Sequence, residues 1–441
     1  MKLNNRLIFI TLTAALGGFL FGFDTAVIAG ATSALEKLFN LDKFWLGFTV
    51  SIALIGTIIG TMVVGKPADL YGRRRILFFL AVFYAISALG CAFSFSWISL
   101  LFFRFLGGIA VGGVSVVGPM YIAEIAPAKY RGRLVGMFQF NVVLGILIAY
   151  FSNYIVGLFG LGEVEWRWKL GVMAIPSVLF FVTLFFIPRS PRWLIKMGLI
   201  DEARAVLHST GEEFVEKEIS EILESIESEK RNGKEVLFSK KFRYPIFLAV
   251  SIAVFNQFTG INGLLYYLND IFAQAGFSKV SGDLQSVAIG ATNLLFTMLA
   301  MSIIDKVGRK ILLLIGSIGT AFSLTGVAFI FFTNSHQHLL VWLLISYIAF
   351  FGFSQGAVIW VYISEVFPNS VRSKGQALGS FTHWIMAAIV SWVFPVMAEK
   401  SGGYPFLFFA AMMLLQFFVV KFMYVETKGK SLEALQKEIL K

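Results

Sequence analysis

Two charged side chains lie inside long apolar stretches of this sequence, where a charge needs a reason. Asp24 lies in the apolar run 7–30, and Arg104 lies in the run 97–122. Because a charge at membrane depth costs about 3 kcal/mol on insertion scales, pairing the two is the simplest compensation. The charge of a buried carboxyl group depends on how close its cationic partner lies, so a changing separation could bind and release a proton. A permanent ion pair that only locks helix packing is the alternative.

The apolar segments that position these residues indicate a membrane protein. Of 441 residues, 57% are hydrophobic and 14% are charged, against roughly 45–50% and about 25% in soluble domains. Windows of roughly 20 residues, enough to cross about 30 Å of hydrocarbon, predict twelve transmembrane helices. These spans are 7–30, 44–65, 76–94, 97–122, 133–159, 169–187, 244–269, 284–304, 311–332, 339–364, 375–398 and 404–424. The single cysteine, Cys91, lies in an apolar run and excludes an intrachain disulfide.

The spacing of the spans predicts an all-α membrane protein with two six-helix bundles. The N-terminal bundle covers 1–187 and the C-terminal bundle covers 244–424, with a short cytoplasmic tail over 425–441. Between the bundles, the polar stretch 188–243 is a predicted cytoplasmic linker. Its segment 201–230 is rich in Glu at helical spacing, which indicates surface helices outside the bilayer.

The net charge of +11 follows the loops rather than gathering on one solvated face. That distribution argues against a nucleic-acid-binding protein. Short loops rich in Lys and Arg stay in the cytoplasm, and the termini, the loops after even-numbered spans and the stretch 188–243 hold 30 of the 37 Lys and Arg residues. We therefore predict an integral protein of the cytoplasmic (inner) membrane with both termini in the cytoplasm.

Matching motifs in the two halves indicate duplication of a six-span unit. The segment 121–127, Tyr-Ile-Ala-Glu-Ile-Ala-Pro, recurs as 362–368, and the segment 69–74 recurs as 305–310. Both motifs bring opposite charges to the predicted cytoplasmic ends of spans. Such charges could clamp the halves in one state and separate in another, and they also serve as topology signals. These gate candidates are Asp69, Arg73, Arg74, Glu124, Arg131, Asp305, Arg309, Glu365 and Arg372.

In this order, the motifs resemble those of the sugar porter family of the major facilitator superfamily, and bacterial proton-coupled glucose/xylose symporters in particular. Besides the repeated motifs, the resemblance rests on Gly22-Phe23-Asp24-Thr25, Arg104-x-x-Gly107-Gly108, Ser190-Pro191-Arg192-Trp193, Asn256-Gln257-x-x-Gly260-x-Asn262 and Glu426-Thr427-Lys428-Gly429. It covers essentially the whole chain. The resemblance implies a major facilitator fold with a central sugar site, working by alternating access. Family members that look like proton symporters carry Asp at position 24, which favours proton coupling through Asp24 and Arg104.

A site for a neutral sugar needs side-chain amides, which both donate and accept hydrogen bonds, and aromatic platforms. In a straight helix Gln257 and Asn262 would lie about 140° apart, so we expect local unwinding at Gly260 and Gly263. Amides that only join neighbouring helices are the alternative. By similarity to the family, the residues expected to face the sugar are Gln139, Gln257, Asn262, Asn293, Trp360 and Trp384.

Further aromatic residues flank this set. The family would place Tyr266 and Tyr267 in an extracellular gate, and an aromatic belt at the membrane interface is the alternative. For His383, beside Trp384, we favour packing against a neighbour over lining the cavity.

The sequence departs from the family's pattern at five positions. At the predicted cytoplasmic gate, Leu70 replaces a basic residue, Arg189 replaces the glutamate of the usual Pro-Glu-Ser-Pro, and Val425 replaces a proline. At the predicted sugar site, Asn256 replaces a glutamine and Ala357 replaces a proline.

We therefore expect a proton-coupled importer of a monosaccharide, either a hexose such as glucose or a pentose such as xylose. An uncoupled facilitator and a polyol or inositol symporter are the alternatives. An enzyme would need paired carboxylates, a metal cluster or a nucleophile with its base, whereas Asp24 is the only acid in the middle of a span. His336 and His338 lack a third ligand in view, so we expect no metal and no cofactor. The expected partners are the sugar, protons and the lipid bilayer, with the chain acting as a monomer.

Overall fold

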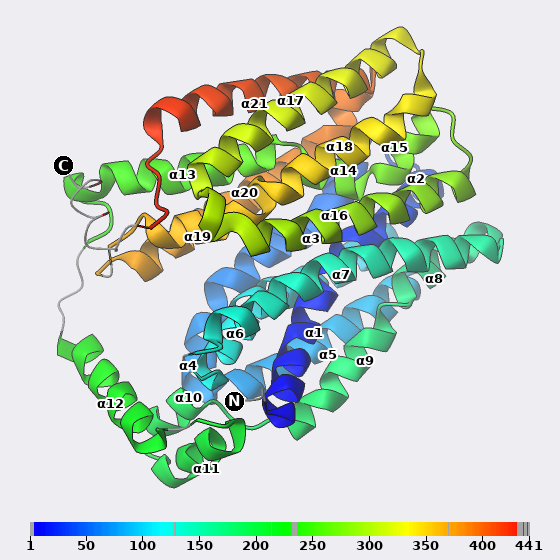
Figure 1. Cartoon of the computed structure of the whole chain (residues 1–441). Coiled ribbons are helices and arrows are strands. Elements are labelled where there is room, and N and C mark those ends of the chain that lie inside the picture. Colours follow the sequence, from blue (N-terminus) through cyan, green and yellow to red (C-terminus); the bar gives the residue numbers. More distant parts are fainter. Residues whose placement is uncertain are drawn as a thin grey trace. The chain divides into compact units, whose positions relative to one another are not determined.

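The computed structural model is built from helices (Figure 1) and describes residues 4–127, 129–212, 214–231, 236–368 and 370–429, with Leu435 and Ile439. The α-helices are α1 (Asn5–Val27), α2 (Thr32–Leu38), α3 (Lys43–Val63), α4 (Gly65–Tyr71), α5 (Arg73–Ala92), α6 (Trp97–Ile125), α7 (Arg131–Leu158), α8 (Glu165–Gly171), α9 (Ala174–Thr183), α10 (Pro191–Lys196), α11 (Ile200–Thr210), α12 (Val215–Arg231), α13 (Arg243–Phe258), α14 (Ile261–Tyr266), α15 (Leu268–Gln274), α16 (Lys279–Val307), α17 (Arg309–Thr333), α18 (Leu340–Phe353), α19 (Gln355–Glu365), α20 (Arg372–Ala398) and α21 (Gly403–Met423). Short 3₁₀ turns are η1 (Ile28–Gly30), η2 (Gly162–Val164), η3 (Leu184–Phe186), η4 (Lys240–Phe242) and η5 (Gln337–Leu339).

Twelve helical stretches of the described chain are long and apolar enough to cross a membrane, which confirms the number expected from the sequence. They are Asn5–Gly30, Lys43–Val63, Arg73–Ala92, Trp97–Ile125, Arg131–Leu158, Gly162–Phe186, Lys240–Tyr266, Lys279–Val307, Arg309–Thr333, Gln337–Glu365, Arg372–Ala398 and Gly403–Met423. Several combine two to four shorter helices. Cys91 is buried near the end of α5, with 4% of its surface exposed.

The chain divides into two compact units, each of which is described by itself. Unit 1 comprises Met1–Thr25, Ile55–Ala149 and Arg167–Gly233, and unit 2 comprises Ala26–Leu54, Tyr150–Trp166 and Lys234–Lys441. These units follow packing, whereas the division of the sequence into bundles at 187 and 243 follows the internal repeat and stays a prediction. Most of the predicted tail, 425–441, lies outside the described residues.

Two ends of the helices are distinguished by their charged residues. We call the ends that carry Asp69 and Glu124 in unit 1, and Asp305 and Glu365 in unit 2, the basic ends, because Lys and Arg cluster in the loops beside them. The other ends are called the opposite ends.

The surface helices predicted after the sixth span are present in unit 1 as α10, α11 and α12 (Figure 1). They bury a small core of their own, which includes Trp193, Leu194, Ala203, Leu207 and Ile219. Helices this short are stable only when they pack against other helices. The apolar residues, spaced along one face of each Glu-rich helix, provide that packing.

In unit 1, α6 and the part of α3 from Ile55 onward pack so closely that glycine is required between them. A Cβ atom at Gly112 would lie 2.9 Å from the backbone nitrogen of Thr61 and would collide with the carbonyl of Thr57. The Thr57 hydroxyl donates to the carbonyl oxygen of Gly108 at 3.2 Å. Small residues that bring backbones together are a common basis of helix association in membranes, where burial of apolar surface gives little driving force.

We therefore predict that Gly112→Val lowers the stability of the purified protein by about 1–3 kcal/mol, because α3 and α6 must separate to admit the side chain. The measurement is thermal unfolding in detergent. The control is Gly132→Val in the first turn of α7, where a Cβ would meet no atom within 4 Å. Equal losses in the two variants would contradict the close-packing explanation.

Candidate functional site

The seventh span of unit 2 is interrupted in the middle, as the spacing of its amides requires. Helix α13 ends before Gly260, which has a left-handed φ of +85°, and α14 begins after it. The break is held by hydrogen bonds: the Thr259 hydroxyl donates to the Asn256 carbonyl at 2.8 Å, and the Tyr347 hydroxyl donates to the Thr259 carbonyl at 2.9 Å. Gly263, the second expected unwinding position, instead lies within α14. Interrupted helices of this kind expose hydrogen-bonding groups at the midplane of transporters.

The interruption brings the predicted amides together. Asn262 Nδ2 donates to Gln257 Oε1 at 2.8 Å, so the angular separation expected of a straight helix is removed. Gln257 Nε2 donates in turn to Asn256 Oδ1 at 3.2 Å and lies 3.2 Å from Nε2 of His383 on α20. Gln257 and Asn256 are 0% and 2% exposed. The cluster therefore joins α13, α14 and α20 through groups that both donate and accept.

Two predicted indoles complete this cluster. The His383 ring lies 4.9 Å from the Trp360 ring of α19 and 5.0 Å from the Trp384 ring, measured between ring centroids. Trp384 is buried, whereas Trp360 is 38% exposed. His383 therefore packs against its neighbours, as expected, and also takes part in the polar network.

The other two predicted sugar-facing residues lie on α16 of unit 2 and on α7 of unit 1. Asn293 is buried on α16, where its Oδ1 accepts from the Thr297 hydroxyl at 3.4 Å. Gln139 is half-buried on α7 of unit 1. Of the six predicted residues, Gln257, Trp360 and Trp384 lie against His383, and Asn262 joins them through Gln257.

Sequence reasoning missed a second buried pair of amides in unit 2. Asn256 Nδ2 donates to the carbonyl of Gln355 at 3.3 Å, and the Gln355 side chain donates to Gln416 of α21. Both glutamines are fully buried. The signal that could have found them is the presence of an amide in an otherwise apolar run, which indicates a hydrogen bond between helices.

The predicted membrane ion pair forms in unit 1. Asp24 of α1 and Arg104 of α6 are 7% and 3% exposed, and Arg104 Nη1 lies 3.3 Å from Asp24 Oδ1. This is a single contact rather than the two parallel bonds that an arginine and a carboxylate can make. Within the described part of the chain, Arg104 Nε has no hydrogen-bond partner. The pair is therefore incompletely satisfied.

At the basic end of unit 1, one arginine joins two of the predicted acids. Arg73 lies 2.9 Å from Asp69 and 2.8 Å from Glu124, which also accepts from the Ser190 hydroxyl. Arg73 and Glu124 are largely buried, so this interaction is screened less than a surface pair.

Two other gate candidates of unit 1, Arg74 and Arg131, have partners that are not themselves gate candidates. Arg74 donates to the carbonyls of Leu184 and Phe185 at 3.0 and 2.9 Å. Arg131 lies 3.4 Å from Glu218 of α12. Burial raises the pKa of Glu218, and the charge of Arg131 opposes that rise.

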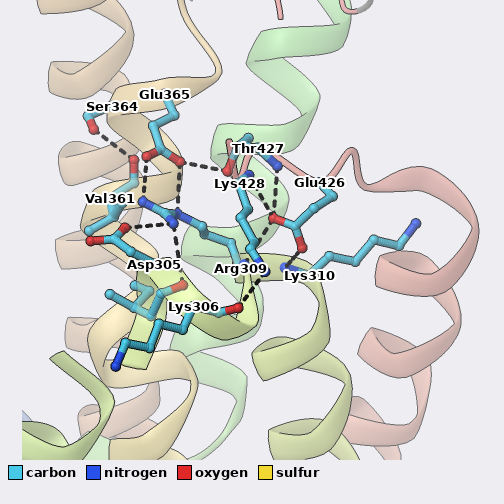
Figure 2. A network of polar contacts seen from close by, with 11 residues as sticks. Asp305, Lys306, Arg309, Lys310, Val361, Ser364, Glu365, Glu426, Thr427 and Lys428 are labelled. Carbon is cyan, nitrogen blue, oxygen red and sulfur yellow. Dashed lines mark hydrogen bonds and ion pairs between the residues drawn. The ribbon is translucent and has the colours of Figure 1, made fainter. Parts of the chain in front are cut away.

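The basic end of unit 2 carries the matching arrangement, which Figure 2 shows. Arg309 lies 2.9 Å from Asp305, and its Nη2 and Nε donate to the Glu365 carboxylate at 2.8 and 3.2 Å. The Thr427 hydroxyl donates to Glu365 at 2.6 Å. Arg372, by contrast, donates to the carbonyl of Phe367 at 3.3 Å.

A residue that was not predicted as a site residue, Glu426, closes this network. Its two carboxylate oxygens accept from the backbone N–H groups of Arg309 and Lys310, each at 3.0 Å (Figure 2). These are the first residues of α17, whose free N–H groups favour a negative charge. Glu426 therefore caps α17.

The two tyrosines of the predicted extracellular gate are buried in protein. Tyr266 and Tyr267 are 4% and 2% exposed. The Tyr267 hydroxyl donates to the carbonyl of Ser391 at 3.0 Å, and its ring stacks on Phe394 with centroids 5.3 Å apart. Both rings are therefore packed inside the protein rather than exposed at its surface, and their role in a gate stays a prediction.

The opposite end of unit 2 is held by contacts between segments far apart in the sequence. Ser33 of α2 donates to Asp270 of α15 at 2.6 Å, and Tyr150 of α7 donates to the carbonyl of Leu265 at 2.7 Å. Burial raises the pKa of Asp270, and the Ser33 hydrogen bond opposes that rise. In the described chain, no group of three or more His, Cys, Asp or Glu residues could hold a metal ion.

The chain is similar over nearly its whole length to known sugar transporters. A family model described as "Sugar (and other) transporter" matches residues 10–439. The D-xylose-proton symporter of Escherichia coli K12 is 36% identical, over 98% of this chain and 96% of the relative. The glucose transporter GlcP of Staphylococcus epidermidis is 37% identical, over 100% of this chain and 98% of the relative. Among solved structures, the inward open conformation of the xylose transporter XylE from E. coli matches with a TM-score of 0.88 and 34% identity, covering 98% of this chain and 100% of the other.

The ion pair in unit 1 leads to a stability prediction. Arg104→Leu should lower the free energy of unfolding by about 3 kcal/mol, because it leaves the Asp24 carboxyl buried without its partner. Adding Asp24→Asn should restore most of that loss, since the uncompensated charge is then gone. Unfolding of the two single variants and the double variant in detergent checks this. Losses that simply add would show that the two side chains do not interact.

Proposed function

The chain belongs to the sugar porter family of the major facilitator superfamily, and from that premise we propose that it imports a hexose or pentose together with a proton. As a member of a transporter family it transports sugar and is not an enzyme. The observation that carries proton coupling is the buried contact between Asp24 and Arg104, the only acid and the only base in the middle of a span.

In the proposed cycle, a proton neutralises Asp24 and releases Arg104 from it. The single 3.3 Å contact suits this role, because one proton removes the whole attraction. A proton moving down the membrane potential supplies about 2.3 kcal/mol per 100 mV. This free energy can hold the concentration of a neutral sugar inside the cell roughly one to two orders of magnitude above the concentration outside.

The sugar is proposed to bind at the cluster of Gln257, Asn262 and His383, with the indoles of Trp360 and Trp384 beside it. The amides bond to each other in this structure, so sugar hydroxyls would replace protein partners rather than fill unpaired positions. The exposed face of Trp360 offers a platform for the apolar face of a sugar ring. Gln139 and Asn293 remain proposed contributors, in keeping with the family resemblance.

The charged networks at the basic ends are proposed to keep each half rigid while alternating access takes place. In the structure each network joins helices of one unit: Arg73 fastens α5 to α6, and Arg309 fastens α17 to α19. This role differs from a direct clamp between halves, which remains a proposal for Arg131 and Arg372. The contact between Ser33 and Asp270 supports a closed gate at the opposite end.

The proposed orientation follows the distribution of basic residues. The basic ends and both termini lie in the cytoplasm of the cell, and the Ser33 and Asp270 contact faces outside. The transporter works as a monomer in this proposal, since one chain contains both halves.

The first test is uptake of radiolabelled glucose and xylose into proteoliposomes, with and without an inward proton gradient. The native protein should accumulate one of the sugars above equilibrium only when the gradient is present. Asp24→Asn should exchange sugar but lose accumulation, because its amide cannot bind and release the proton. Asp201→Asn, the same change at a 98% exposed side chain on α11, should accumulate sugar like the native protein.

Other outcomes of this assay separate the alternatives. Equilibration that ignores the gradient in the native protein would identify an uncoupled facilitator and leave Asp24 structural. Uptake of neither sugar would direct the search to polyols such as inositol.

The sugar site is tested by direct binding. Gln257→Ala and Asn262→Ala should each weaken sugar binding by at least about tenfold, because each removes hydrogen bonds to buried hydroxyls. Quenching of intrinsic tryptophan fluorescence reports the affinity, since Trp360 and Trp384 lie beside the amides. Gln337→Ala, in the turn η5, is the matched control and should bind normally. Unchanged affinity in both site variants would place the sugar elsewhere.

A further inference from the structure

The duplicated halves build the same backbone at the start of α5 and of α17. Gly72 and Gly308, with φ of +89° and +104°, precede Arg73 and Arg309. Such φ values favour glycine, and the two helices therefore begin in the same way. Each of the two arginines bonds to an aspartate four residues before it and to a glutamate from the fourth or tenth span.

The correspondence continues into the segments that follow the sixth and twelfth spans. Tyr121 donates to the carbonyl of Pro188 at 2.7 Å, and Tyr362 donates to the carbonyl of Val425 at 3.1 Å. Two residues further on, Ser190 and Thr427 donate to the glutamates of the two networks. The residue between Pro188 and Ser190 is therefore equivalent to the residue between Val425 and Thr427. It is Arg189 in the first half and Glu426 in the second.

This one position differs in charge, and the difference matters for the helix beside it. Glu426 caps α17 by accepting from the N–H groups of Arg309 and Lys310. Arg189 brings a cation to the corresponding place in unit 1. Gly72, the residue that precedes α5, has no side chain that could cap the helix, and the charged side chain that corresponds to Glu426 is the cation of Arg189. The first half therefore lacks the anion that the second half supplies from its own sequence.

A cavity of about 230 Å³ lies at this place and is lined by basic side chains. Its lining includes Gly72, Arg73, Arg74, Arg75, Arg189 and Trp193. Arg73 is paired with carboxylates, but Arg74 bonds only to carbonyl oxygens, and the nearest carboxylate to Arg189 is the half-exposed Glu202 at 3.6 Å. The cavity consequently carries an excess of positive charge.

An unpartnered buried donor points to the same conclusion independently. The Trp193 side chain is 7% exposed, and its Nε1 has no hydrogen-bond partner among the described residues. The ring lies against Gly72: Cε2, which is bonded to Nε1, is 3.1 Å from the position that a Cβ of Gly72 would occupy. Buried N–H groups normally have an acceptor, and none of the residues that the structure describes provides one here.

We propose that this cavity binds a phosphate group, which takes the place that the Glu426 carboxylate has in the second half. Guanidinium groups match the geometry of phosphate oxygens, and the N–H groups at the start of α5 add donors. Basic residues that served only to keep this loop in the cytoplasm would not need to line a common cavity. The inference does not rest on sugar transport.

The phosphate group can come from a lipid headgroup or from a free anion. Close to the cavity, Phe79, Phe185 and Phe186 are 62%, 57% and 69% exposed, and Arg74 bonds to the Phe185 carbonyl. Exposed phenylalanine rings indicate a surface that meets lipid, so a lipid headgroup can reach the arginines at the ends of these helices. Both sources supply the same chemistry, so the experiment has an arm for each.

The first arm measures thermal unfolding of the purified full-length protein in detergent as inorganic phosphate is added, against sodium chloride at equal ionic strength. The native unfolding temperature should rise with phosphate and saturate. Arg189→Glu should abolish the rise, because the new carboxylate occupies the site as Glu426 does, and should unfold no earlier than the native protein without phosphate. Arg189→Gln should bind at least about threefold more weakly. Arg243→Glu, the same charge change at an exposed residue of α13, should respond like the native protein.

The second arm compares nanodiscs of phosphatidylcholine with nanodiscs that also contain phosphatidylglycerol. Stabilisation of the native protein, but not of Arg189→Glu, by phosphatidylglycerol identifies a lipid headgroup; the same difference with inorganic phosphate alone identifies a free anion. The proposal is overturned if Arg189→Glu and the native protein respond alike in both arms, or if sodium chloride reproduces the effect of phosphate.

Discussion

The structure depends on one constraint: polar groups inside an apolar span must find partners within the protein. Asp24 meets Arg104, and Gln355 meets Gln416, each pair joining two helices that the sequence keeps far apart. Backbone groups at the break in the seventh span follow the same rule, with Tyr347 bonding to the carbonyl of Thr259. Because water cannot replace these partners in hydrocarbon, each such pair specifies which helices are neighbours.

Because the chain contains a duplicated unit, the contacts of each residue in one half can be compared with those of the equivalent residue in the other. The arginines at the start of α5 and α17 repeat the same contacts with an aspartate and a glutamate. Because the backbone is the same at both helix starts, a difference in the side chains beside it indicates a difference in what those side chains bind. The capping role of Glu426 in the second half shows what the first half loses where Arg189 replaces a carboxylate.

Much of this architecture could be predicted from the sequence, for reasons that differ from residue to residue. The pair of Asp24 and Arg104 followed from their isolation in apolar spans, and the meeting of Gln257 with Asn262 followed from the glycine between them. The partners of Arg74 and Arg372 could not be predicted, because both bond to backbone carbonyls, which every residue carries. The bond between His383 and Gln257 joins two helices distant in sequence, and no local pattern indicates it.

The burial of the single cysteine has a practical consequence for studying motion. Cys91 is 4% exposed near the end of α5, so water-soluble thiol reagents have little access to it in the folded protein. Cysteines introduced in pairs at exposed positions would then be the principal labelling sites, without removal of the native residue. Spin labels or fluorophores attached in pairs would report distances across the working cycle in a chain that is otherwise of natural sequence.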